Sequence, residues 1–125
     1  MSQARFATAI NCMDGRTQLP VIEWMKKEFG VEYVDSITEP GPVRILAEPA
    51  EVAESIRQRV RISVERHGSK AVALVAHHDC AGNPVDRKTQ LAQLRAAIET
   101  VCGWGFPVEV VGLWVGEDWG VQRVE

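Results

Sequence analysis

The sequence lacks the features that membrane, nucleic-acid-binding and disulfide-stabilised proteins need. No stretch approaches the about 20 apolar residues that span a bilayer, and the N-terminus has no signal-peptide pattern. The formal net charge is −3, and no basic block is interleaved with aromatic residues. The three cysteines cannot all pair with one another, which favours a reducing compartment over a disulfide framework. We therefore expect a cytoplasmic protein with neither a membrane nor a nucleic acid among its partners.

The apolar pattern predicts one α/β domain over residues 1–125. Short runs of small or β-branched residues predict strands at 6–10, 31–37, 71–76 and 108–115, with a short final strand at 121–124. Apolar residues at helical spacing predict helices at 17–30, 49–66 and 86–102. This alternation is typical of a three-layer fold, in which helices cover both faces of a mostly parallel four-stranded sheet with a short extra edge strand.

Two motifs, each at the end of a predicted strand, carry the residues with metal chemistry. A C-M-D-G-R motif begins at Cys12, and an H-H-D-C motif begins at His77. In open parallel sheets ligands bind beyond the carboxyl ends of the strands, where both motifs fall. Cys12, His77 and Cys80 then form the sulfur and nitrogen set that Zn²⁺ prefers, with one ion per chain. Asp14 is either a fourth ligand or a carboxylate beside an open fourth position.

Asp14 and Arg16 are predicted to form an ion pair beside the metal. They lie two positions apart, so both side chains point the same way from an extended segment. The fork of N–H donors on arginine matches a carboxylate. The pair would hold Asp14 as an acceptor for a water on the metal, so we expect Asp14 and Arg16 to be the catalytic residues.

The second motif offers two histidines. The spacing i, i+3 favours His77 over His78 as the partner of Cys80 at the metal. His78 is then either a solvent-facing turn residue or a proton shuttle. Asp79 either orients a ligand or is an ordinary turn carboxylate.

Other segments give structural predictions. Thr17 is expected to cap the first helix, and His67 to act as a cation at the end of the second. Residues 38–42 are expected to form a rigid turn that is neither helical nor paired in a sheet, because they include two prolines and a glycine. Cys102 is expected to be buried and inert.

The two motifs resemble those of the β-class carbonic anhydrases, whose zinc is held by the Cys of C-x-D-x-R and the His and Cys of H-x-x-C. The resemblance covers most of the chain and includes Gly112-Leu113-Trp114-Val115, which looks like the last core strand of that family. It implies a zinc lyase of the carbonate dehydratase type, in which zinc-bound hydroxide converts carbon dioxide to bicarbonate. It also implies a homodimer or a higher homo-oligomer, to which Trp104, Trp114 and Trp119 could contribute apolar contact area.

The sequence departs from that family at several points. Typical members have an N-terminal helical arm, for which we expect no room here, and an Arg-Asn-Ala-Gly type loop where this chain has residues 38–42. Gly15 stands where a serine is common. The metal ligands are present, but the segments that contact the substrate in that family differ. Carbonyl sulfide and carbon disulfide, which close relatives of the family hydrolyse, are therefore candidate substrates together with carbon dioxide.

Three other functions fit the sequence less well. A thiol phosphatase needs an arginine six residues after its cysteine, and neither Cys12 nor Cys80 has one. Thioredoxin-like chemistry needs Cys-x-x-Cys, which is absent. The strongest alternative is a non-catalytic zinc-binding domain in which Asp14 closes the metal site.

Overall fold

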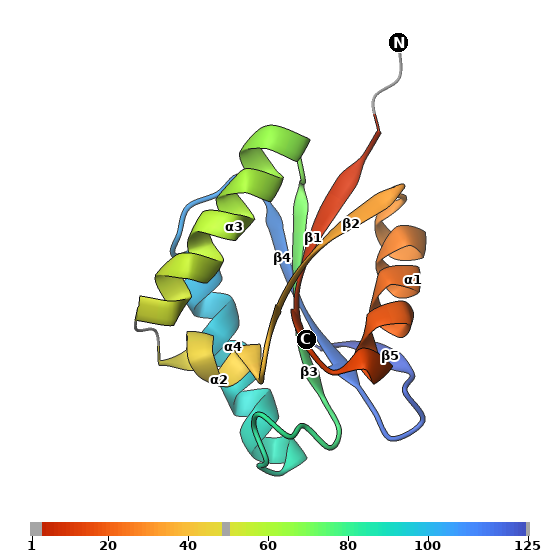
Figure 1. The fold of residues 1–125 in the computed structure, drawn as a ribbon, viewed down its shortest axis with the longest axis vertical. Coiled ribbons are helices and arrows are strands. Elements are labelled where there is room, and N and C mark those ends of the chain that lie inside the picture. Colours follow the sequence, from red (N-terminus) through yellow and green to blue (C-terminus); the bar gives the residue numbers. More distant parts are fainter. Residues whose placement is uncertain (1–3, 49–50, 125) are drawn as a thin grey trace.

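The computed structural model describes residues 4–48 and 51–124 and shows a twisted sheet between two layers of helices (Figure 1). The sheet has the order β2-β1-β3-β4-β5, and its strands are β1 (Phe6–Cys12), β2 (Tyr33–Glu39), β3 (Ala71–His77), β4 (Glu109–Val115) and β5 (Val121–Val124). The first four are parallel, and β5 runs antiparallel to β4. The predicted fold class is confirmed.

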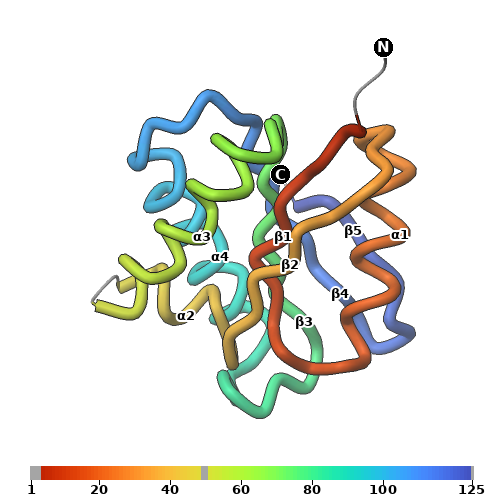
Figure 2. The backbone as a smooth tube through the Cα atoms, turned by 45° about the horizontal axis from the view of Figure 1, so that its top comes forward, coloured from red at the N-terminus to blue at the C-terminus, as the bar shows by residue number. Residues whose placement is uncertain are grey.

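The helices divide unequally between the two faces. They are α1 (Gln18–Phe29), α2 (Pro42–Ala47), α3 (Glu51–His67) and α4 (Arg87–Cys102), with a 3₁₀ turn at Gly15–Thr17. Helix α1 lies alone on one face, whereas α2, α3 and α4 lie together on the other (Figures 1 and 2). Each face has its own apolar core, and buried β1 and β3 contribute to both. None of the described helices is long and apolar enough to cross a membrane.

The strands end later than the apolar pattern predicts. Strands β1 and β3 include Cys12 and His77 as their last residues, so these two side chains are fixed by sheet pairing rather than carried on loops. Strand β2 begins two residues later than predicted and continues to Glu39, which pairs with Cys12. Helix α3 is described from Glu51, and the predicted first residues 49–50 lie outside the described part.

The prediction for residues 38–42 is wrong at both ends. Thr38 and Glu39 pair with β1, and Pro42 is the first residue of α2. Proline fits there because the first turn of a helix does not use its N–H groups, and the ring presets a helical φ. Only Pro40 and Gly41 form the turn.

Two smaller predictions also need correction. Cys102 is exposed, because it lies one position beyond buried Val101 on α4 and therefore faces away from the sheet. Thr17 occupies the N-cap position of α1 but makes no capping bond. Its backbone is already helical there, and its hydroxyl donates to the carbonyl of Asp14 at 2.8 Å.

A buried hydroxyl cluster joins α3 to the sheet. The Ser63 Oγ lies 2.6 Å from the Thr8 hydroxyl and 2.7 Å from the Ser69 hydroxyl. It donates to Asp35 Oδ2 at 2.7 Å, and the His67 Nδ1 lies 2.7 Å from the same oxygen.

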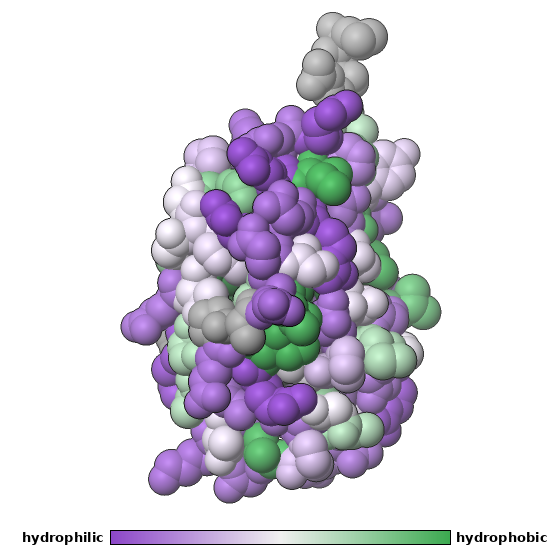
Figure 3. Space-filling model, turned by 60° about the vertical axis from the view of Figure 1, so that its left-hand side comes forward, coloured by the Kyte–Doolittle hydropathy of each residue, from purple (hydrophilic) through white to green (hydrophobic). Residues whose placement is uncertain are grey.

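The face of the molecule in Figure 3 is mostly hydrophilic, in keeping with the charged outer side of α3.

Candidate metal centre

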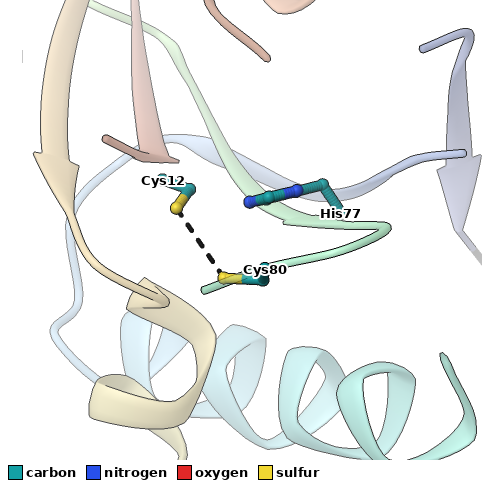
Figure 4. A group of neighbouring side chains, drawn as sticks. All are labelled: Cys12, His77 and Cys80. Atoms are coloured by element: carbon teal, nitrogen blue, oxygen red, sulfur yellow. Dashed lines mark hydrogen bonds between the residues drawn. The ribbon is translucent and has the colours of Figure 1, made fainter. Parts of the chain in front are cut away.

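Cys12, His77 and Cys80, which we call the ligand triad, meet at the carboxyl edge of the sheet (Figure 4). Their ligand atoms all lie within 4.8 Å of one another, and all three residues are buried. The two sulfurs are 3.8 Å apart. Two sulfurs bound to one zinc at about 2.3 Å in tetrahedral geometry would be about 3.8 Å apart, whereas a disulfide requires about 2.0 Å. The spacing therefore fits a shared metal ion.

The His77 ring is oriented for metal binding. Its Nδ1 lies 2.7 Å from the carbonyl oxygen of His78 and must donate to it, so Nε2 carries the lone pair. This Nε2 is buried and has no hydrogen-bond partner among the described residues. The side chain of Gln90 on α4 donates to the His77 carbonyl at 2.8 Å and fixes the end of β3. An orphaned buried nitrogen beside two thiols is the arrangement that a bound metal would satisfy.

The local electrostatics favour one ionised sulfur. Burial raises the pKa of Cys12, but interaction with His77 and with the backbone N–H groups of Gly41 and Asp14 outweighs it and lowers the pKa to about 7. Burial and the neighbouring Cys12 raise the pKa of Cys80. Burial lowers the pKa of His77, and interaction with Cys12 and the His78 carbonyl reverses that effect and raises it. Metal ligands bind in their deprotonated forms, and Cys12 is the thiol prepared for this.

The predicted pair of Asp14 and Arg16 is present. One Asp14 oxygen accepts from the Arg16 backbone N–H at 2.9 Å and from Nε at 3.1 Å, and the other accepts from Nη2 at 2.7 Å. These hydrogen bonds hold the pKa of Asp14 at about 2. In the described part of the chain, Asp14 is not among the residues whose ligand atoms cluster within 4.8 Å. Arg16 therefore holds the carboxylate beside the triad rather than within it.

A pocket of about 400 Å³ opens onto Cys12 and Asp14. Its remaining walls are Met13, Pro40, Ala81 and Gly82, which are mainly apolar. A small uncharged molecule could lie in this pocket beside Cys12 and Asp14, because most of the wall is apolar.

Two glycines allow the turn before α2 to touch the loop that carries Cys80. Gly41 has a φ of +63°, and a Cβ there would lie 2.7 Å from the Cβ of Asn83. A Cβ on Gly82 would lie 2.7 Å from the Cβ of Pro40. The close approach holds the turn after β2 against the loop after β3, beside the triad.

Sequence reasoning missed the place of Trp119. The Arg16 guanidinium carbon lies 4.4 Å from the Trp119 ring centroid, and the same ring lies 6.3 Å from the His77 and His78 rings. The predicted topology puts the turn after β4 at the same sheet edge as the two motifs, but nothing in the sequence indicates the contact with Arg16. Asp79 also contacts Arg16. His78 is half-buried, and whether it acts as a proton shuttle or is only a turn residue stays a prediction.

Comparison with known proteins finds structures with the same fold. Among solved structures, the chain is similar to a tetrameric β-carbonic anhydrase from the filamentous ascomycete Sordaria macrospora, at 13% identity and a TM-score of 0.66, over 98% of this chain and 82% of that one. It is also similar to the β-carbonic anhydrase CafA of the fungal pathogen Aspergillus fumigatus, at 15% identity and a TM-score of 0.58, over 99% of this chain and 77% of that one. No curated protein matches.

These structures share the fold, and the family is identified independently. Residues 2–125 match the family described as "Putative carbonic anhydrase". Because that match extends over nearly every residue, the chain belongs to this carbonic anhydrase-like family, as its two motifs predicted.

Proposed function

We propose that the protein is a zinc-dependent hydrase that adds water to carbon dioxide, or to carbonyl sulfide or carbon disulfide. The observation that carries this proposal is the unpartnered Nε2 of His77 facing two buried thiols 3.8 Å apart. The donors for one Zn²⁺ would be the Sγ of Cys12, the Sγ of Cys80 and this Nε2. Three protein ligands are typical of catalytic zinc sites, whereas structural sites have four.

The bound ion would supply a Lewis acid that lowers the pKa of a water ligand to about 7. The chain's own residues would do the rest. Asp14, whose pKa is about 2, is ionised at neutral pH and would accept a hydrogen bond from the attacking water and orient it. Arg16 would hold the carboxylate in place with a guanidinium that is always charged at neutral pH. The apolar pocket would admit the uncharged substrate.

The alternative is a non-catalytic zinc domain closed by Asp14. The hydrogen bonds from Arg16 favour the open site, because they occupy both carboxylate oxygens. The deciding experiment is stopped-flow hydration of carbon dioxide from pH 6.5 to 9, run beside carbonyl sulfide hydrolysis on zinc-replete protein. We expect a rate that rises with pH, and a large loss in Asp14→Ala and Arg16→Ala with zinc retained. Cys102→Ala, which removes the exposed thiol, is the matched control.

A zinc-replete protein with no rate above buffer on either substrate would contradict the hydrase and leave the closed domain. Elemental analysis of protein purified without added metal should give one zinc per chain. A folded and active protein that contains no metal would contradict the metal assignment itself. Unchanged activity in Arg16→Ala would leave the enzyme in place but remove the ion pair from the mechanism.

We also propose that the protein forms a homodimer or a higher homo-oligomer in the cytoplasm. Met13 lies within the first motif and Leu19 follows it, and the two residues are 63% and 69% exposed. The Sordaria macrospora enzymes are described as tetrameric. Thiols kept free for a metal suit a reducing compartment. Light scattering should give at least two chains per particle, and Leu19→Ser should shift the protein toward the monomer. Ile62→Ser, an exposed apolar residue on α3, is the control. A wild-type monomer at high micromolar concentration would refute self-association.

A further inference from the structure

Two residues with unusual backbone conformations both contact Arg16. Among the described residues, the non-glycine residues with positive φ are Asp79 at 58° and Trp119 at 62°. Aspartate tolerates this left-handed region, but a bulky residue such as tryptophan is an outlier there. Strained backbone of this kind persists where the surrounding structure enforces it, and it clusters at functional sites.

The contacts surround the Arg16 guanidinium. Its Nη1 donates to Asp79 Oδ2 at 3.3 Å, and its Nη2 donates to the Asp79 carbonyl at 3.2 Å. The group lies over the Trp119 ring, and its Nε and Nη2 donate to Asp14. The Arg16 side chain is 48% exposed, so its position depends on these contacts rather than on burial.

The turn between β4 and β5 holds Trp119 without help from Arg16. The Trp119 N–H donates to the Gly116 carbonyl at 2.9 Å, and the Gly116 N–H donates to the Gly120 carbonyl at 3.1 Å. The Gly120 N–H donates to Asp118 Oδ1 at 2.9 Å. The turn is thus a preformed support against which the guanidinium rests.

We propose that Trp119 and Asp79 are positioning residues that clamp Arg16 and thereby keep Asp14 off the metal. This inference rests on the proposed zinc site. Without the clamp the arginine side chain is free to turn to solvent. Asp14 then loses the Nε and Nη2 donors and keeps only the Arg16 backbone N–H on one of its oxygens. The carboxylate then becomes available as a fourth ligand, and the site closes to small molecules. The turn after β4 would therefore control whether small molecules can reach the metal.

The test uses Co²⁺-substituted protein and thiocyanate, an anion that changes the visible spectrum only where it can reach the metal. We expect wild type and the control Trp104→Ala to bind thiocyanate, and Trp119→Gly to bind it at least 10-fold more weakly. Glycine suits the positive φ, so this variant should fold. Trp119→Phe, which keeps an aromatic face, should restore most of the binding. Asp79→Asn, which keeps a residue tolerant of the backbone, should weaken it.

The decisive variant combines Trp119→Gly with Asp14→Ala. If the carboxylate closes the site, its removal should return thiocyanate binding to near the wild-type value, which a general loss of structure could not produce. In metal-free protein, the Arg16 Nε–H signal in ¹⁵N NMR should lose its ring-current shift in Trp119→Gly and keep it in Trp104→Ala.

Equal thiocyanate binding by Trp119→Gly and wild type would overturn the clamp, as would a wild-type protein that does not bind thiocyanate. Failure of the double variant to recover would overturn it too. These outcomes are separate from the hydrase proposal, because a clamp confirmed by the cobalt spectra would stand even if wild type showed no hydration rate.

Discussion

Replacing Gly41 with alanine is expected to destabilise the fold and weaken metal binding together. Gly41 has a φ of +63°, and a Cβ there would lie 2.7 Å from the Cβ of Asn83 and 3.1 Å from the carbonyl oxygen of Gly82. Both neighbours belong to the loop that comes after Cys80. The added methyl would therefore push on the segment that places one of the two sulfurs.

The expected magnitude has two parts. An L-residue in the left-handed region costs about 1–2 kcal/mol, and overpacking against backbone costs about 1–3 kcal/mol, so the total is about 2–5 kcal/mol. Gly68 provides the matched control, because its φ is +70° and no atom lies within 4 Å of the corresponding Cβ. Gly68→Ala should lose only the first part, about 1–2 kcal/mol.

The assay is urea unfolding of metal-free protein under reducing conditions, followed by zinc affinity from competition with a chelator. Gly41→Ala should be the less stable variant and should bind zinc at least about 10-fold more weakly, which corresponds to about 1.4 kcal/mol. Equal stabilities for the two variants, within about 0.5 kcal/mol, would refute the steric reasoning. An unchanged zinc affinity in Gly41→Ala would show that the contact supports the fold without supporting the site.

The same structure supports three further predictions. Cys80→Ala should lose its zinc and, because metal binding energy is also folding energy, should unfold at lower temperature than zinc-loaded wild type; equal zinc content in both would contradict the triad. The pKa of Asp14 is about 2, against a usual 3.8. In metal-free protein the difference in unfolding free energy between wild type and Asp14→Asn should therefore be complete above about pH 4 and should shrink as the pH falls toward 2. A difference that does not change with pH in urea titrations would count against the ion pair. Ser63→Ala should lower the free energy of unfolding in urea by about 1–3 kcal/mol, because it leaves the buried Thr8 hydroxyl without a partner. Ser55→Ala, at an exposed position on the same helix, should change it by no more than about 0.5 kcal/mol. Equal losses in the two variants would show that the hydroxyl cluster does not stabilise the fold.

The fold and the ligand positions could be predicted because short-range patterns specify them. Apolar runs bounded by turn residues identify buried strands, and their alternation with helices implies a parallel sheet. A parallel sheet collects the carboxyl ends of its strands at one edge, so Cys12, His77 and Cys80 could be brought together without coordinates. That they hold zinc remains a prediction.

The features that could not be predicted depend on contacts that no local pattern encodes. The prediction for residues 38–42 failed because proline breaks the interior of a helix but suits its first turn. Whether Pro42 ends a helix or begins one is decided by the packing of the residues that follow it. Trp119 was expected only to contribute to an oligomer contact. Its contact with Arg16 was missed because it arises only when the hairpin after β4 folds over the first motif. Cys102 was expected on the wrong side of α4 because the end of a helix leaves little pattern to fix its rotation.

The separation of the two sulfurs along the chain has a kinetic consequence. Cys12 and Cys80 are 68 positions apart, and β1 pairs directly with β3 although α1, β2, α2 and α3 separate the two strands in the sequence. Closing such a long loop is entropically costly, and parallel pairings of this kind form slowly. The complete set of three donors thus exists only once the sheet has assembled. A metal that joins these donors acts after the rate-limiting step, so it would lengthen the lifetime of the folded state rather than hasten its formation.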